Sequence, residues 1–352
     1  MALAHNLGAS LIGHEHQLKQ AQQAFCNGEL DEAGLRAVGR ALRAAHWQTQ
    51  QAAGIELLAV GDFAWSDPLL SHSLTLGVIP EHLRSLDGAK PTLHTLFALA
   101  DSLSEETAPW FDTPHRYRVP EFSADQSFSL SWEQLFEEVD EAQALGHAVK
   151  PVLIGPLTYL WLGKAKADGF DKLDLLERLL PLYDQILNRL ASQGVEWVQI
   201  DEPILALELP QAWKNAYERA YNILQRAPLK KLVATYFGGL DANLGLAANL
   251  PVDGLHIDLV RAPAQYPTIL DRLPAYKVLS LGVVNASAVQ RGDLEANLNI
   301  LRHAHERLGE RLWVAPASPV DEAFTEQTCQ EVVLLAEALK QAEIVQELRM
   351  AV

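Results

Sequence analysis

The segment 194–203 constrains the fold of this chain more than any other part of its sequence. It is a short β-rich run, Gly-Val-Glu-Trp-Val-Gln-Ile, that ends abruptly in Asp201 and Glu202. Pro203 follows, and a proline cannot donate the backbone hydrogen bond that would continue a strand. Because (β/α)8 barrels assemble their sites at the carboxyl ends of their strands, this segment indicates a barrel strand with two carboxylates at its end.

Short apolar runs alternate with amphipathic segments along the whole chain. We expect strands near residues 3–7, 55–60, 150–154, 196–200, 231–236, 254–259, 277–283 and 312–314. We expect helices over segments that include 32–53, 131–145, 171–192, 294–308 and 322–346. Eight strands separated by helices predict an α/β fold, a single (β/α)8 TIM barrel formed by residues 1–352. A doubly wound open sheet is the alternative, although no G-x-G-x-x-G fingerprint supports it.

Residues 77–125 interrupt this alternation with a segment rich in Pro, Gly, Ser and Asp. Long irregular segments within compact domains tend to be functional or disordered. We therefore expect an irregular insertion over the mouth of the barrel. Arg116 and Arg118 within it could bind a carboxylate or a phosphate, or they could be ordinary surface charges.

The composition limits the classes of partner and compartment. With 352 residues, 49% of them hydrophobic, the chain can bury a large core. Its formal net charge of −17 disfavours nucleic acid as a partner, because an acidic surface repels phosphate groups. No run of about 18 apolar residues could span a membrane, and the first residues lack the pattern of a secretory signal. Cys26 and Cys329 form no C-x-x-C pattern, which favours a cytoplasmic protein without a thiolate-rich metal site.

Carboxylates stand at the ends of three predicted strands. Asp62 comes just after the strand near 55–60, following Gly61. Asp201 and Glu202 close the strand at 196–200, and Asp258 lies near the end of 254–259. Parallel strands bring these ends together, so the four side chains could converge and bind a substrate ammonium or a metal, or act as acid and base. Alternatively, each of them caps the helix that follows or pairs with a nearby Arg or Lys.

Three further features have both a chemical and a structural interpretation. Trp65 could form a pocket wall, although tryptophan more commonly packs in a core. His256 and Asp258 share one strand face and are weak candidates for metal ligands, whereas a buried, hydrogen-bonded histidine is the structural alternative. The segment 14–16, His-Glu-His, contains metal-ligand residue types, but residues two apart on a helix point to different sides, so we expect a solvated helix start.

Several long runs resemble one known family, cobalamin-independent methionine synthase, and they follow one another in that family's order. The resemblance extends over nearly the whole chain and concerns the N-terminal half of the family. The runs that carry it are 37–47, 53–65, 119–122, 150–158, 196–203, 234–237, 255–260 and 312–314.

The resemblance implies a fold and a pathway. Members of that family consist of two related (β/α)8 barrels, of which the C-terminal one holds zinc. That barrel transfers a methyl group from 5-methyltetrahydropteroyl-polyglutamate to homocysteine, and the N-terminal barrel contributes to folate binding and to the interface between the two. The resemblance therefore implies a barrel in methionine biosynthesis that is not a self-sufficient methyltransferase and acts as partner subunit of a separate zinc barrel. An independent enzyme acting on a methionine-like or pterin-like ligand, or a non-catalytic metabolite-binding module, is the alternative.

This chain departs from the family where zinc would be held. The positions that match the zinc ligands of the catalytic barrel carry Thr235, Phe237, Asp258 and Ser318, which include no thiolate, so we expect no zinc and no other firmly bound cofactor.

Other matched positions imply ligand contacts. Asp62 and Asp201 match acidic residues that hold the ammonium of the amino acid in the catalytic barrel, which implies homocysteine or methionine as a ligand. Lys19 matches a lysine that contacts the glutamate tail of folate, which keeps folate as a further ligand, although the neighbouring arginines of the family are absent here.

Overall fold

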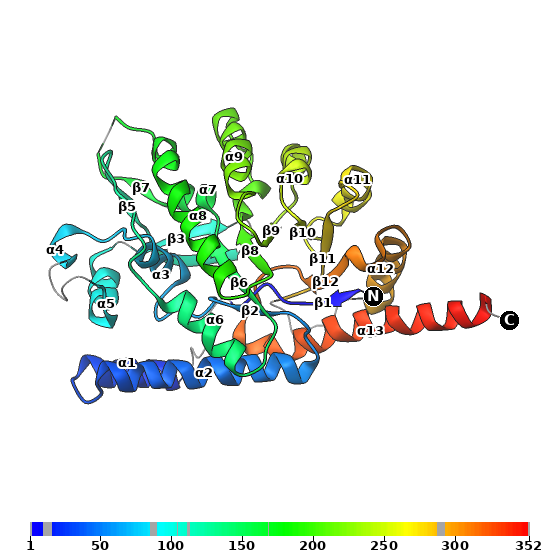
Figure 1. Ribbon diagram of the computed structural model, residues 1–352, viewed down its shortest axis with the longest axis horizontal. Coiled ribbons are helices and arrows are strands. Elements are labelled where there is room, and N and C mark those ends of the chain that lie inside the picture. The colour runs from blue at the N-terminus through cyan, green and yellow to red at the C-terminus, as the bar shows by residue number, and fades with distance from the viewer. Residues whose placement is uncertain are drawn as a thin grey trace.

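Eight parallel strands form one curled sheet at the centre of the molecule, and helices fan out around it (Figure 1). The computed structural model describes residues 2–9, 16–84, 90–103, 105–110, 113–167, 169–286 and 293–350. In spatial order the strands are β1 (Leu3–Ala4), β12 (Leu312–Pro316), β11 (Val278–Val284), β10 (Gly254–Asp258), β9 (Lys230–Ala234), β8 (Trp197–Asp201), β6 (Val149–Ile154) and β2 (Leu58–Val60).

The sheet closes on itself. His5, next to β1, forms a parallel bridge with Leu57, next to β2, and this bridge joins the two edge strands. The predicted (β/α)8 barrel is therefore confirmed, and the open sheet is excluded. Every predicted strand is present, and the boundaries differ by a few residues.

The helices cover the outside of the ring. They are α1 (Gln17–Cys26), α2 (Glu32–Ala53), α3 (Pro68–Thr75), α6 (Gln134–Ala144), α7 (Pro156–Leu162), α8 (Leu176–Ser192), α9 (Gln211–Leu224), α10 (Leu244–Asn249), α11 (Tyr266–Arg272), α12 (Leu294–Leu308) and α13 (Thr325–Met350). The predicted helices at 32–53 and 294–308 are confirmed to the residue, whereas α8 starts at Leu176 because residues 172–175 form a 3-10 turn. No helix among the described residues is long and apolar enough to cross a membrane.

The segment 77–125 is more regular than its composition suggests. It contains α4 (Glu81–Arg84) and α5 (Leu93–Ser102), followed by an antiparallel hairpin of β3 (Glu105–Trp110) and β4 (Thr113–Arg118). A short strand, β5 (Glu121–Phe122), then pairs with β7 (Lys164–Ala165). Side chains of α5 pack with those of α1, α2 and α3 in a second apolar core, beside the barrel. The segment is therefore a packed extension of the barrel.

The interior of the barrel changes character along its axis. At the amino ends of the strands, Leu57, Trp197, Leu232 and Trp313 form an apolar cluster. Two residues further along β8, alternation of the strand brings Gln199 to the same interior face as Trp197. The next layer is polar and consists of His5, Lys150, Gln199, His256 and Ser280, all of them buried. Barrel interiors are usually filled by branched apolar side chains, so the presence of this polar layer requires a structural or functional explanation.

We predict that Gly54→Ala destabilises the fold. Gly54 ends α2 with φ 99°, and an added Cβ would lie 3.0 Å from Val333 Cγ1 of α13. An L-residue in this left-handed region costs about 1–2 kcal/mol, so the unfolding midpoint in denaturant should fall. Gly245→Ala within α10 is the matched control, because a Cβ there meets nothing closer than Arg272 at 3.7 Å. Equal midpoints for the two variants would contradict the prediction.

Candidate functional site

A cavity of about 450 Å³ opens where the strands end. The carboxyl ends of β2, β6 and β8 contribute to its wall, together with α3, α6 and Tyr117 from the hairpin of the segment 77–125. Its polar lining includes five acidic side chains, Asp62, Asp67, Glu138, Asp201 and Asp321. Its apolar lining includes Leu7, Phe63, Trp132, Leu153 and Phe237. A partly apolar cavity with a few convergent polar groups is the usual form of a small-molecule site.

Asp62 supplies the cavity with an unused hydrogen-bond acceptor. It follows Gly61, whose φ of 83° turns the chain at the end of β2. Its Oδ2 accepts a hydrogen bond from the Ala9 N–H at 2.8 Å and lies 4.0 Å from His46 Nε2. Its Oδ1 is buried and has no partner among the described residues. Burial raises the pKa of Asp62, and the nearby His46 and the Ala9 N–H oppose this shift.

Asp201 is held from two sides at the end of β8. Its Oδ1 accepts from Gln199 Nε2 at 2.7 Å, and its Oδ2 accepts from the Tyr236 hydroxyl at 3.1 Å. Burial raises the pKa of Asp201 to about 7, whereas Gln199, Lys150 and Tyr236 favour the ionised form. Asp62 and Asp201, two of the four predicted carboxylates, therefore line the same cavity.

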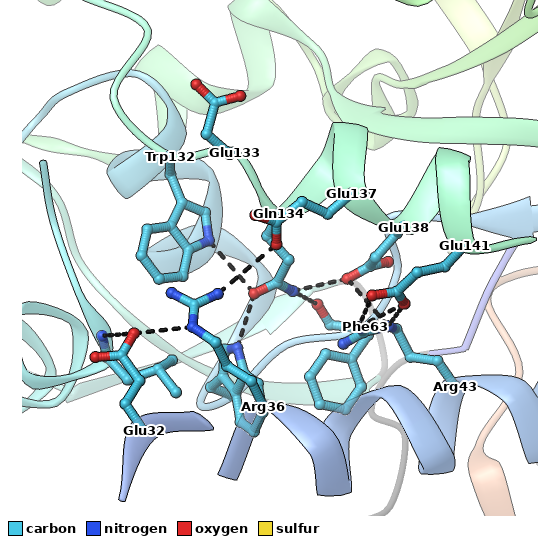
Figure 2. A network of polar contacts seen from close by, with 12 residues as sticks. Glu32, Arg36, Arg43, Phe63, Trp132, Glu133, Gln134, Glu137, Glu138 and Glu141 are labelled. Carbon is cyan, nitrogen blue, oxygen red and sulfur yellow. Dashed lines mark hydrogen bonds and ion pairs between the residues drawn. The ribbon is translucent and has the colours of Figure 1, made fainter. Parts of the chain in front are cut away.

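A network on α6 supports this part of the wall. Figure 2 shows Gln134 between Trp132 and Glu138. The Gln134 Oε1 accepts from the indoles of Trp65 at 2.7 Å and Trp132 at 3.3 Å, and its Nε2 donates to Glu138 Oε1 at 2.7 Å. Trp65 is thus held outside the cavity lining, whereas Trp132 forms part of it.

Glu138 links this network to the turn that places Asp62. Its Oε2 accepts from the Gly61 N–H at 2.9 Å, and Arg43 Nε lies 3.9 Å from its Oε1 (Figure 2). Burial and the charge of Asp62 raise the pKa of Glu138 to about 7, and Arg43 opposes them. The backbone before Asp62 is therefore fixed by a buried carboxyl group on a separate helix.

Glu202 lies outside the cavity lining. Successive residues of a strand face opposite sides, so Asp201 faces the interior of the barrel and Glu202 faces the helices. The Glu202 carboxylate accepts from the Thr158 N–H at 2.9 Å, the Thr158 hydroxyl at 2.6 Å, and the hydroxyls of Tyr217 at 2.9 Å and Tyr221 at 3.1 Å. These contacts join β8 to α7 and α9, so Glu202 contributes to the packing of the barrel wall.

Asp258 also lies outside the cavity lining, although Arg261 and Phe237 beside it belong to that lining. Its carboxylate accepts from the N–H groups of Val260 at 3.0 Å, Arg261 at 2.9 Å and Phe237 at 3.2 Å. The Arg261 guanidinium lies 3.2 Å from its Oδ2. Asp258 thus closes the turn after β10 and pairs with a nearby arginine, which was one of the two structural alternatives.

The remaining candidates are separate from the cavity. Lys19 is exposed on α1, and His16 is exposed just before it, whereas residues 14 and 15 lie outside the described residues. His256 is fully buried, and its Nδ1 lies 2.8 Å from Ser280 Oγ. Burial lowers the pKa of His256 to about 3, so its ring is neutral at pH 7.

The residues at the zinc-matched positions do not fit zinc. The Thr235 hydroxyl donates to the His256 carbonyl at 2.7 Å, Phe237 has no donor atom in its side chain, and Asp258 is saturated as described. Ser318 offers a hydroxyl, so the set contains no thiolate and no imidazole. Within the described residues, no group of three or more His, Cys, Asp or Glu side chains is arranged to hold a metal ion.

Several residues of the cavity region were missed from the sequence. Ser71 and His72 on α3, and Tyr236 after β9, line the cavity, and the Ser71 Oγ is buried without a partner among the described residues. No local pattern singles out Ser71 or His72 among the other residues of an apolar helix. The sequence could have pointed to Lys150, because a lysine at the start of an apolar strand must find a buried partner.

The comparison with protein families decides the wider assignment. Residues 3–309 match the family described as cobalamin-independent synthase, N-terminal domain. The chain belongs to this family. The predicted resemblance is thereby confirmed, and the chain is a methionine-synthase-like barrel domain.

Solved structures share the architecture of this synthase barrel. A B12-independent methionine synthase from Shewanella sp. W3-18-1, solved in complex with selenomethionine, has 14% sequence identity and a TM-score of 0.69, with 97% of this chain and 98% of that chain covered. A methyltransferase from Methanosarcina mazei has 10% identity and a TM-score of 0.59, with 96% and 94% covered. At these identities the likeness shows the fold.

We predict that Glu202→Gln destabilises the protein by about 2–3 kcal/mol, because an amide –NH₂ would face groups that now donate to the carboxylate. Chemical denaturation measures this loss. Glu177→Gln is the control, because Glu177 forms an exposed pair with Arg219 at 3.1 Å and should change stability by less than about 1 kcal/mol. A Glu202→Gln variant as stable as this control would refute the structural role of Glu202.

Glu138 should make stability depend on pH. Its folded pKa, raised to about 7, lies above its unfolded value, so its stabilising contribution is complete below the unfolded pKa and is lost as pH rises to 7 and above. Relative to Glu138→Gln, which does not titrate, the wild type should lose about 1–3 kcal/mol of unfolding free energy between pH 5 and pH 8. Denaturant titrations of both proteins at the two pH values measure the difference, and a constant difference would contradict it.

Proposed function

We propose that this chain is a cytoplasmic ligand-binding barrel in methionine biosynthesis. It acts in folate-linked methyl transfer to homocysteine as the partner subunit of a separate zinc-containing barrel. Membership of the synthase family supports the pathway. The side chains at the zinc-matched positions support the dependence on a partner, because activation of a homocysteine thiol by zinc requires soft ligands that these residues do not supply.

One observation carries the ligand assignment. Asp62 Oδ1 is a buried carboxylate oxygen without a partner among the described residues, and Asp62 lines the cavity. An unpaired buried acceptor costs free energy until a donor reaches it, and an ammonium group is a charge-assisted donor for a carboxylate. Asp201, in the same cavity, adds a second acidic side chain that favours a cationic ligand group.

The rest of the cavity supports a small amino acid as the ligand. Phe63, Trp132 and Leu153 provide apolar surface for a thioether or thiol side chain. The Ser71 hydroxyl, which has no partner among the described residues, can meet a second polar group of the ligand. Homocysteine and methionine have this combination of groups. The fold shared with the Shewanella enzyme, which was solved with selenomethionine, supports the same class. A folate contact at Lys19 is proposed only from the family resemblance, because Lys19 is exposed on α1, outside this cavity.

Calorimetry with methionine, homocysteine and 5-methyltetrahydropteroyl-triglutamate tests the ligand. We expect methionine or homocysteine to bind, and Asp62→Asn to weaken binding about 10- to 100-fold, because the charge-assisted hydrogen bond is lost. Asp67→Asn is the matched control. Asp67 lines the same cavity, but its oxygens accept from the N–H groups of Leu70 at 2.8 Å and Arg118 at 3.3 Å. Equal affinity of the Asp62→Asn variant and the wild type would refute the site.

Methyl transfer to homocysteine, measured with and without a separate zinc barrel, tests the subunit role. We expect no turnover by this chain alone and a higher rate, or tighter folate binding, in the mixture. Turnover by the isolated chain would establish an independent enzyme instead. Ligand binding without any effect on the zinc barrel would establish a metabolite-binding module.

A further inference from the structure

A lysine is enclosed in the polar layer beneath the cavity. Lys150, on β6, is fully buried, and its Nζ donates to the Asn6 carbonyl at 3.2 Å and to the Gln199 Oε1. Both of these partners are neutral. Burial of an ammonium group is costly unless opposite charge compensates it, so these two hydrogen bonds do not by themselves account for a lysine at this position.

The amide of Gln199 connects Lys150 to Asp201. Gln199 accepts from Lys150 through Oε1, and it donates through Nε2 to Asp201 Oδ1 at 2.7 Å and to the Leu7 carbonyl at 2.9 Å. A flipped amide would turn Nε2 toward the ammonium group and Oε1 toward the carboxylate, so the charges of Lys150 and Asp201 fix its orientation. The orientation of Asp201 is thereby linked to Lys150.

The charges that face Lys150 are unbalanced without it. Asp201 and Asp62 both act on Lys150 and raise its pKa, whereas burial lowers that pKa to about 7. His5 and His256 also lie in this layer, but burial lowers the pKa of each, so neither supplies a positive charge at pH 7. Asp62 also has His46, whose Nε2 lies 4.0 Å from its Oδ2, whereas among these groups Lys150 is the cation that can compensate Asp201.

The other buried lysines of the barrel have a different environment. Lys277 Nζ donates to the carbonyl of Ala248, at 2.6 Å, and to that of Leu250. Lys231 Nζ donates to the carbonyls of Ala227 at 2.9 Å and Leu229 at 2.8 Å. These carbonyls follow or end α9 and α10, where a cation is favourable at a helix C-terminus. Lys150 instead donates to the side-chain amide of Gln199, which in turn donates to the cavity carboxylate of Asp201.

We propose that Lys150 is a positioning residue of this site, an internal counter-ion that keeps Asp201 charged and oriented while no cationic ligand occupies the cavity. The inference deepens the proposed ligand site, because Asp201 favours a cationic ligand group in the cavity only if it is ionised before the ligand arrives. A ligand ammonium bound at Asp62 in the same cavity would then share the compensating role of Lys150.

Carbon-13 NMR of protein labelled at the aspartate carboxyl carbon tests this directly, with the Asp201 signal assigned by its loss in Asp201→Asn. Lys150→Gln keeps a hydrogen-bond donor toward Gln199 but removes the charge. We expect the titration midpoint of Asp201 to rise by at least about one pH unit, a tenfold change in the ratio of its two forms. Lys150→Arg, which keeps the charge, should restore a midpoint close to that of the wild type.

Lys277→Gln is the matched control, because it removes a buried lysine whose ammonium donates to the backbone carbonyls of Ala248 and Leu250. It should leave the Asp201 midpoint within about 0.3 pH unit of wild type. If Lys150→Gln does not fold, Lys150→Met removes the same charge and should give the same upward shift. An unchanged midpoint in a folded Lys150 variant without the charge, or an equal shift in the control, would overturn the proposal. The titration needs no ligand, so it decides the role of Lys150 even if no amino acid binds and the proposed function fails.

Discussion

The free-energy cost of placing charged groups inside a closed barrel is the constraint on which this site depends. The apolar cluster of Leu57, Trp197, Leu232 and Trp313 fills the amino end of the interior as barrels commonly do. Above it, polar side chains replace the branched apolar ones, and each needs a partner within reach. The hydrogen bonds that satisfy Lys150, Gln199 and Asp201 therefore fix both the strand ends and the floor of the cavity. Stability and the proposed ligand binding rest on the same contacts.

Carboxylates at the strand ends serve different purposes, and hydrogen bonding separates them. Glu202 and Asp258 are each saturated by protein donors, so they join elements or close a turn. Asp62 keeps one buried oxygen without a described partner, and only this arrangement leaves binding energy for a ligand. A carboxylate near a cavity is therefore weak evidence for a binding role until its hydrogen bonds are counted. Glu202 is adjacent in sequence to a cavity residue and still lies outside the lining.

The sequence predicted the barrel because strands and helices leave local signals. Each barrel strand is an apolar run, and α2 ends at the glycine that follows it. Strand alternation alone sets Gln199 and Asp201 on one face of β8 and Glu202 on the other. Hydrogen bonds between residues far apart in the sequence could not be predicted. Asn6 lies 144 residues from Lys150, and Gly61 lies 77 residues from Glu138. Periodicity in the sequence does not reveal such pairs. The position of the cavity could therefore be predicted, but the residues that form its wall could not.

Binding and metal chemistry make separate demands on a barrel of this family. A zinc site needs several soft ligands at once, and at the positions that match the family's thiolates this chain carries Phe237 and Ser318. An ammonium pocket needs only ionised carboxylates in a partly apolar cavity, and such a pocket can persist when the metal ligands are lost. The counter-ion role of Lys150 fits this separation, because an internal cation makes an empty acidic cavity tolerable without any metal. A domain can thus keep affinity for an amino acid while the reaction itself depends on another protein.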